Sequence, residues 1–204
     1  FDMKLLIPSG SSAADLEKCE FFSISHDNWN YGSAPAASGK LLYADGEGFY
    51  LYMRCDEADP FRTYTKENDP VYQDSAMEAF FNFFPDLPDS GYVNFEMNAN
   101  GAMLSQYGTG REGRKYLADL GISAPKCSAK IHADFWELSL FIPLDFIYEV
   151  YGLSDARPQI DKIRCNFYKI KESKPGEHYM SFAPIDAPSP DFHRPDFFAD
   201  GVIA

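Results

Sequence analysis

Apolar and polar residues alternate with a period of two along much of this chain, and this pattern constrains its fold more than any other feature. The apolar side chains that share one face of residues 49–56 are Phe49, Leu51, Met53 and Cys55. Because neighbouring side chains of a strand point to opposite faces, this segment is predicted to be a strand with one buried face.

Other segments extend the pattern. Residues 92–98 alternate in the same way, whereas residues 76–84 are apolar on both faces and favour a central strand. Turn residues at 45–48 and 98–101 are expected to join strands into hairpins. Further strands are expected at residues 40–44, 102–107, 129–133, 135–142, 162–170 and 179–184.

Only two segments favour helices. Pro143 precedes an apolar stretch that Gly152 closes, which predicts one short amphipathic helix. A second helix is expected at residues 113–120. Many short strands joined by Gly, Pro, Asn and Asp turns, without βαβ alternation, predict an all-β fold, an antiparallel β-sandwich with one or two short helices. A length of 204 residues with 45% hydrophobic content fits a single domain over residues 1–204.

The alternation also predicts the core between the two sheets. Its expected members are Phe49, Leu51, Met53, Phe95, Met97, Leu138 and Phe167. We assign Trp29 and Trp136 to packing as well, because Trp136 shares a strand face with Leu138. The four cysteines form no Cys-x-x-Cys pair, so free buried thiols are expected, although three disulfide pairings stay open.

The net charge of −13 disfavours nucleic acid and anionic membrane surfaces as partners. The small basic group Arg111, Arg114 and Lys115 is expected to be solvated surface, with a possible ligand role for Arg111. No apolar run reaches the length of a bilayer span, and the chain opens with no signal-peptide pattern. The compartment and the oligomeric state stay open.

Polar residues gather where a core would reject them. Asn94, Glu96 and Asn98 project from one face of the strand at 92–98, and Glu78 interrupts an apolar run. A buried carboxyl needs hydrogen-bond donors. Two interpretations of Glu78 are therefore kept: contact with a ligand, or pairing with Arg54, Arg111 or Arg164.

The chain ends in a segment in which aromatic, charged and proline residues alternate over positions 189–198. Proline fixes φ and favours extended geometry in the preceding residue. The segment is therefore predicted to be a rigid loop that displays Phe192 and His193 at a shallow recognition site with little ordering cost.

Six motifs follow one another along the chain, at residues 72–75, 77–78, 92–98, 166–169, 184–185 and 190–198. Together they resemble carbohydrate-binding module family 9 and its stand-alone relatives, from about Trp29 to the end of the chain. The resemblance implies a β-sandwich of the DOMON-related, immunoglobulin-like or jelly-roll type. It also implies a non-catalytic module that clamps a terminal sugar between two aromatic side chains.

Carried over by position, Tyr72 matches the first stacking aromatic and Glu78 the sugar-contacting carboxylate. Phe192 or His193 matches the second aromatic. Glu96 lies near where those modules place an Arg, so Arg111 is the candidate donor. The predicted ligand-binding residues are Tyr72, Glu78, Asn94, Glu96, Asn98, Arg111, Phe192, His193 and Arg194.

A physical argument for a sugar site accompanies the resemblance. A pyranose has apolar faces and a rim of hydroxyl groups, so a binder needs aromatic platforms together with amide, carboxylate and guanidinium groups. Both sets occur near the predicted site. We therefore expect a saccharide ligand and no catalytic residue.

Alternatives are kept beside this interpretation. Glu78 and Glu96 would be the two carboxyls of a glycoside-processing enzyme. A DOMON-like haem-binding domain would draw axial ligands from Met77, Met97, Met180, His132, His178 and His193. An interaction domain with a degenerate pocket is the third. Calcium is the one cofactor considered: the acidic residues Asp56, Glu57, Asp59, Asn68 and Asp69 could bind it, although a solvated face is the preferred interpretation.

Overall fold

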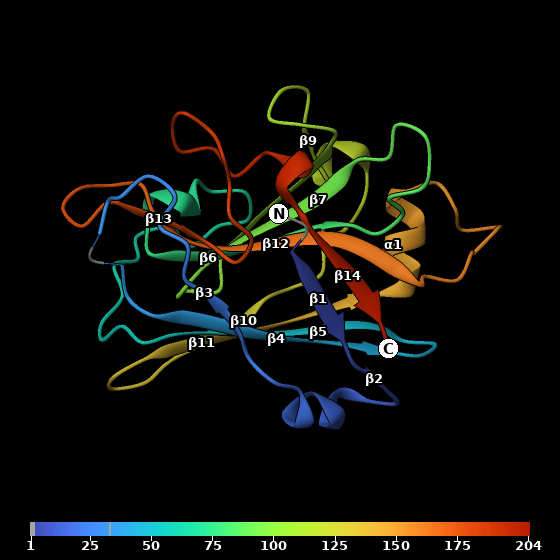
Figure 1. The fold of residues 1–204 in the computed structure, drawn as a ribbon, viewed down its shortest axis with the longest axis horizontal. Coiled ribbons are helices and arrows are strands. Elements are labelled where there is room, and N and C mark those ends of the chain that lie inside the picture. Colours follow the sequence, from blue (N-terminus) through green and yellow to red (C-terminus); the bar gives the residue numbers. More distant parts are fainter. Residues whose placement is uncertain (1–2, 33) are drawn as a thin grey trace.

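Two sheets lie face to face and enclose the main hydrophobic core (Figure 1). The computed structural model describes residues 3–32 and 34–204. The eight-stranded sheet has the order β1 (Lys4–Ile7), β14 (Ala199–Ile203), β12 (Lys162–Lys171), β6 (Ala76–Asn82), β7 (Tyr92–Asn98), β8 (Met103–Gly108) and β9 (Lys115–Tyr116), and β13 (His178–Ser181) also pairs with β12. The six-stranded sheet has the order β10 (Ser128–Ile131), β11 (Trp136–Pro143), β5 (Gly48–Cys55), β4 (Ala37–Ala44) and β2 (Ser9–Gly10), with β3 (Phe22–Ile24) beside β4.

Helices are short in the described part of the chain. The helix α1 (Leu144–Val150) follows β11 where the sequence predicts it. The 3-10 helices are Ala13–Lys18, Val71–Gln73, Ala118–Leu120 and Pro195–Phe197. None of the helices that the structure describes is long and apolar enough to span a bilayer.

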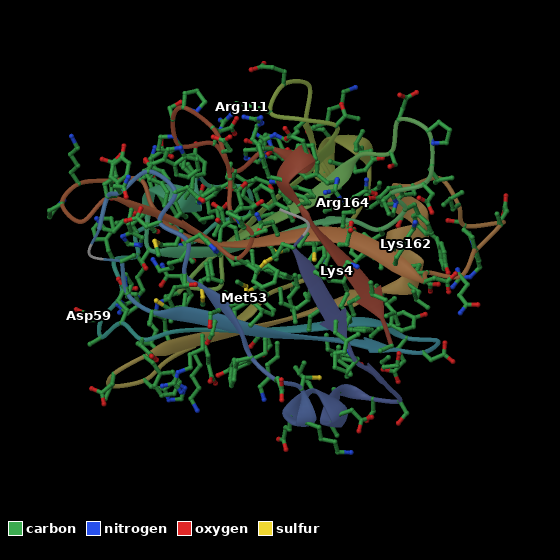
Figure 2. The ribbon with its side chains drawn as sticks, viewed as in Figure 1. Lys4, Met53, Asp59, Arg111, Lys162 and Arg164 are labelled. Atoms are coloured by element: carbon green, nitrogen blue, oxygen red, sulfur yellow. The ribbon has the colours of Figure 1, made fainter. Side chains whose placement is uncertain are left out.

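The all-β sandwich and every strand expected from the sequence are confirmed, with shifts of a few residues at the ends. The seven expected core residues, among them Met53, which Figure 2 labels, are all buried between the sheets. Trp136 is fully buried in the same core, whereas Trp29 is half-buried and packs against a second cluster outside it. The strict period of two therefore identified the inner faces of the strands.

The sequence pattern missed the strands of the N-terminal segment. β1 pairs in parallel with β14, and β2 pairs in parallel with β4, so residues 4–10 contribute to both sheets. These are the two parallel pairs in the described part of an otherwise antiparallel fold. Because β1 pairs with a strand from the opposite end of the chain, no local sequence pattern predicts this pairing.

The helix expected at residues 113–120 is wrong. Lys115 and Tyr116 form β9 and pair with Tyr107 and Gln106, and only residues 118–120 make a 3-10 turn. Pairing with the edge of β8 overrides a weak local helix preference, because propensity is only a prior. The consequence is functional, since this pairing directs Tyr116 towards the pocket described below.

The eight-stranded sheet is buried on both faces. Met77, Ala79 and Phe81 of β6 face the six-stranded sheet, whereas Ala76 and Phe80 belong to the second hydrophobic cluster on the opposite, outer face. Residues of the C-terminal segment complete that cluster. Arg111 also lies on the side away from β4 and β5 (Figure 2).

The four cysteines are free, and Cys19, Cys55 and Cys165 are buried as expected. Burial raises the pKa of the Cys55 and Cys165 thiols to about 12, which keeps both protonated and unreactive at neutral pH. Cys127 is only partly exposed. The structure therefore contains none of the three possible disulfide pairings.

Two glycines of the β4–β5 hairpin test the fold. Gly48 has a φ of +144°, and a Cβ there would collide with the carbonyl oxygen of Ile142 on β11, whereas a Cβ at Gly46 would meet open space. We expect Gly48→Ala to lower the free energy of unfolding by about 2–3 kcal/mol. Gly46→Ala should lose only about 1 kcal/mol, because its φ of +76° is strained for alanine without a clash. Equal losses in chemical denaturation would contradict the close approach of β5 to β11.

Candidate functional site

A pocket of about 590 Å³ opens on the outer face of the eight-stranded sheet. Its floor is formed by Glu78 of β6, Glu96 of β7, Leu104 and Gln106 of β8, and Ile170 of β12. Its walls come from the connections that cross this face, and they contribute Asn68, Pro70, Tyr72, Arg111, Arg114, Tyr116, Glu172, Tyr179, Pro190, Asp191, Phe192 and His193.

Tyr72 reaches the pocket from a short 3-10 helix, Val71–Gln73, that begins after Pro70. Its ring is half-buried and packs against the hydrophobic clusters on the outer face of the sheet. Burial is the main reason why the pKa of its hydroxyl is raised, so the phenol is neutral at neutral pH. Tyr72, the expected first stacking aromatic, therefore lies at the pocket wall.

Asn98, in contrast, does not line the pocket. Its Nδ2 donates to the carboxylate of the fully buried Asp74 (3.0 Å) and to the carbonyl of Tyr64 (2.8 Å), and its Oδ1 accepts from the backbone N–H groups of Asn100 and Ala102. Since all its polar atoms hold the wall segment and the β7–β8 turn, its expected ligand contact is corrected to a structural role.

Glu78 and Glu96 occupy directly opposite positions in the antiparallel pair of β6 and β7. Their exposed fractions are only 1% and 4%. The Cβ atoms of opposed residues lie about 4.5–5.5 Å apart. Two negative charges there would repel by roughly 3 kcal/mol at an effective dielectric constant of about 20. The pair is therefore too close and too dry to carry two charges comfortably.

Burial, followed by the Glu96 carboxylate, raises the pKa of Glu78 well above its ordinary value. Burial also raises the pKa of Glu96, against the opposing effects of a hydrogen bond with Glu78 and the charge of Arg114. We assign the proton to Glu78 and the charge to Glu96 at neutral pH. The ion pair considered for Glu78 with Arg54, Arg111 or Arg164 does not form: these arginines pair with Asp56, Asp191 and Asp200.

Two buried oxygens at this floor lack hydrogen-bond partners among the residues that the structure describes. They are Oε1 of Glu78 and Oδ1 of Asn94. Asn94 does not line the pocket itself, but its Nδ2 donates to Oε2 of Glu96 at 2.9 Å. A buried acceptor without a hydrogen bond lowers the stability of the fold, and neither oxygen has a donor among the described residues.

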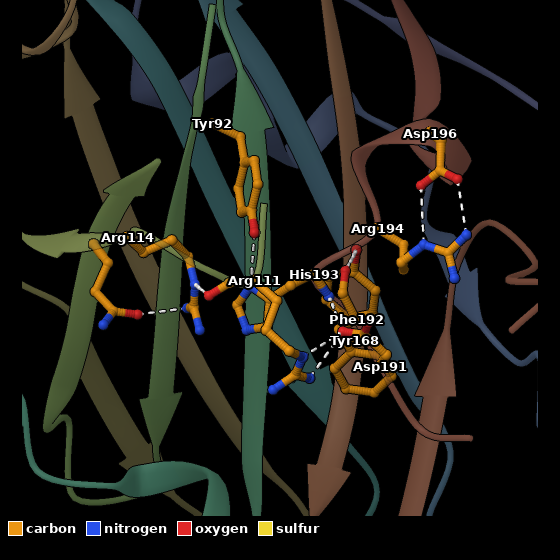
Figure 3. A network of polar contacts seen from close by, with 10 residues as sticks. Tyr92, Arg111, Arg114, Tyr168, Asp191, Phe192, His193, Arg194 and Asp196 are labelled. Atoms are coloured by element: carbon orange, nitrogen blue, oxygen red, sulfur yellow. Dashed lines mark hydrogen bonds and ion pairs between the residues drawn. The ribbon is translucent and has the colours of Figure 1, made fainter. Parts of the chain in front are cut away.

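Two arginines approach the pocket from the β8–β9 connection (Figure 3). Arg111, the expected donor, binds Oδ1 of Asp191 through Nε (3.0 Å) and Nη2 (2.8 Å). Arg114 was expected to be solvated surface, but it is half-buried and donates to Oε1 of Gln106 at 2.5 Å. The sequence thus missed the arginine that acts most strongly on the carboxyl pair.

The expectation of displayed, exposed Phe192 and His193 is wrong. Phe192 is 5% exposed and stacks on Tyr168 with ring centroids 4.2 Å apart. His193 stacks on Phe80 and shares a hydrogen bond of 2.8 Å between its Nδ1 and the Tyr92 hydroxyl (Figure 3). Both line the pocket, but the packing buries most of each ring because the sheet beneath is apolar.

Arg194 lies outside the set that lines the pocket. Its guanidinium binds both carboxylate oxygens of Asp196 and lies over the ring of Phe197. Asp191 does shape the loop, since its Oδ1 accepts the backbone N–H of His193 at 3.0 Å. The ligand contact expected of Arg194 is therefore corrected to a local contact within its own loop.

The pocket residues that the sequence analysis did not predict include Arg114, Tyr116, Glu172 and Tyr179. Tyr116 and Arg114 belong to the segment misread as a helix. Tyr179 opens a predicted strand, and its position beside Trp29 and Phe192 depends on packing between distant segments. A strand pattern with a period of two at residues 115–116 was too short to detect.

The acidic residues considered for calcium do not gather into one site. No group of three or more carboxylate, histidine or cysteine side chains in the described residues is arranged to hold a metal ion. Asp56 pairs with Arg54, and Glu57 accepts from Trp136 and Ser75. Asp56 and Glu57 thus already have protein partners, and calcium binding stays a prediction.

The residues considered for haem ligation are also dispersed. Met77 and Met97 lie in the core between the sheets, whereas His193 lies on the outer face of the same sheet. His178 bonds Lys169 through Nε2 and the carbonyl of Gly176 through Nδ1. Met180 shares a face of β13 with His178, but both ring nitrogens of His178 are already hydrogen-bonded.

Comparisons with known proteins agree with this architecture. Residues 10–203 match the family profile described as Carbohydrate-binding family 9. The comparison with curated proteins found no match. A candidate carbohydrate-binding protein from Bacteroides uniformis ATCC 8492 has a similar structure, with a TM-score of 0.82 and 24% sequence identity over 99% of each chain.

Two further structures come from a carbohydrate binding module of family 9 of Caldicellulosiruptor kristjanssonii. The complex with glucose has a TM-score of 0.69 and 11% identity, and it covers 98% of this chain and 95% of that chain. The complex with cellotriose has a TM-score of 0.65 and 12% identity, and it covers 98% and 93%. At such identities these likenesses establish the fold.

Phe192 provides the test of this site's construction. Because its ring is buried on Tyr168, we expect Phe192→Ala to lower the free energy of unfolding by about 3–5 kcal/mol, as for other core aromatics. Phe61→Ala is the matched control, since Phe61 is 48% exposed and should lose less than about 1 kcal/mol. Denaturant midpoints measure both. A small loss for Phe192→Ala would restore the displayed-loop interpretation.

Proposed function

The chain belongs to carbohydrate-binding family 9, and from that premise we propose that it is a non-catalytic protein that binds a saccharide end in the pocket on the outer face of the eight-stranded sheet. One observation supports this most directly. The pocket combines partly exposed tyrosine rings at its wall with the carboxyl groups of Glu78 and Glu96 on its floor. A pyranose ring offers apolar faces to the first and hydroxyl donors to the second.

The aromatic part of the pocket comes from separate segments. Tyr72 and Tyr116 are half-buried at its wall, and Tyr179 adds a third ring from β13. Flat rings of this kind bury the C–H face of a sugar with little loss of side-chain freedom. Phe192 supports these rings from below, because it contacts Tyr179 and Tyr168. Tyr72 is therefore proposed as the main stacking residue.

The polar part of the pocket matches the rim of a sugar. Glu78 and Glu96 provide acceptors on the floor, and Arg114 provides a guanidinium at the wall. Arg111 is proposed to act through Asp191, because the pair joins the β8–β9 connection to the C-terminal loop. Planar donors and acceptors of these kinds give hydroxyl recognition its direction.

The arrangement of the carboxyls favours binding over hydrolysis. A glycosidase places two carboxyls on opposite sides of the scissile bond. Glu78 and Glu96 instead lie side by side on the floor, so both approach a ligand from the same side. This geometry supports a recognition role for the pair.

Glucose and cellotriose are the first ligands to test, because two similar structures are complexes with these sugars. We expect Tyr72→Ala to weaken binding by about 1–3 kcal/mol, which is roughly a 5- to 150-fold rise in Kd. The loss follows from removal of the stacking surface. Isothermal titration calorimetry measures it.

Tyr50→Ala is the control for that measurement. Tyr50 stacks on Phe141 on the six-stranded sheet and does not line the pocket, so its removal should leave the Kd unchanged. An equal loss in both variants would contradict the proposed site. Release of glucose from cellotriose by the wild-type protein would contradict the non-catalytic role.

A further inference from the structure

The carboxyl pair at the pocket floor carries an inference that rests on the proposed function. Glu78 and Glu96 are opposed across β6 and β7, both are buried, and Oε2 of Glu96 already accepts from Asn94. Oε1 of Glu78 has no partner among the described residues and lies at the floor of the pocket. The two carboxyls therefore lie opposite each other on adjacent strands, and both residues line the pocket.

We propose that Glu78 and Glu96 hold one proton between them and that this shared proton is required for ligand recognition. Protonated Glu78 donates to Glu96, so the ligand meets one neutral carboxyl and one carboxylate instead of two charges. The pocket therefore takes a neutral saccharide and rejects a uronate, whose carboxylate would meet the negative charge of Glu96 on the floor.

The charged and titratable groups around the pair are consistent with one shared proton. They are Arg111 and Arg114 from the β8–β9 connection, Tyr92 on β7, Tyr168, Lys169 and Glu172 on and after β12, and Tyr72 and His193 from the walls. The arginines keep their charge at any ordinary pH. Burial raises the pKa of the phenols and lowers that of His193 to about 2, so these groups stay neutral.

The sign of the pH dependence follows from the raised pKa of Glu78. A carboxyl whose pKa is higher in the folded state stabilises the fold below its ordinary value of 4.5 and loses this contribution as the pH rises through the folded value. A ligand that covers the pocket removes water from the pair and makes the second charge still less favourable. The affinity for the ligand, like the stability of the fold, is therefore expected to fall as the pH rises.

The first experiment uses the free protein and needs no ligand. Thermal midpoints are measured from about pH 4 to about pH 9 for the wild type, Glu78→Gln and the exposed control Glu149→Gln. Glutamine resembles a protonated glutamate that cannot ionise. We expect Glu78→Gln to become more stable relative to the wild type as the pH rises, whereas Glu149→Gln follows the wild-type profile. Parallel profiles for all three proteins would overturn the shared proton.

The second experiment measures binding of glucose and glucuronate by calorimetry. We expect the wild-type affinity for glucose to fall at least about tenfold between about pH 6 and about pH 9, the change that one pKa unit would give. In Glu78→Gln the affinity for glucose at about pH 6 should be nearly equal to that at about pH 9. Glucuronate should bind at least about tenfold more weakly than glucose at neutral pH.

The outcomes separate this inference from the proposed function. Equal glucose affinity at both pH values, or glucuronate binding as tight as glucose binding, overturns the role of the proton in recognition. If neither glucose nor cellotriose binds at any pH, the proposed function fails, and the profile of the free protein still decides whether the pair holds one proton.

Discussion

Burial of both faces of the eight-stranded sheet is the constraint on which the rest of the structure depends. Its inner face packs on the six-stranded sheet, and its outer face is covered by connections from three parts of the chain. Loops that cover one side of a sheet can leave a hollow between them, whereas a second sheet packed on that side would fill the space. The pocket lies in that hollow, and its floor is therefore as dry as a core.

A dry floor changes what polar residues do there. In water, Glu78 and Glu96 would both be charged, but on this sheet burial raises both pKa values, and the charge of Glu96 raises that of Glu78 further. The same floor leaves Oε1 of Glu78 and Oδ1 of Asn94 without partners in the described residues. Such groups destabilise a fold unless a donor reaches them.

The sequence predicted what depends on local pattern and failed where distant segments meet. Alternation identified the strands and core, and a carboxyl within an apolar run identified Glu78. The same alternation suggested a ligand contact for Asn98, because pattern alone cannot show that Asp74 and the β7–β8 turn use all its polar atoms. Arg114 was missed because its position depends on β9 pairing with β8. Register, and not composition, decides these roles.

The pocket is shaped before a ligand arrives, and packing accounts for this better than charge. The Arg111–Asp191 pair joins two walls, but Arg111 is half exposed, and such pairs contribute about 1 kcal/mol or less. Phe192 and His193 hold the same loop through rings stacked on Tyr168 and Phe80. Burial of such rings stabilises by several-fold more. Phe192 and His193, which were expected to contact a sugar, therefore serve first to fix the pocket wall. A fixed wall loses less conformational entropy when a ligand binds.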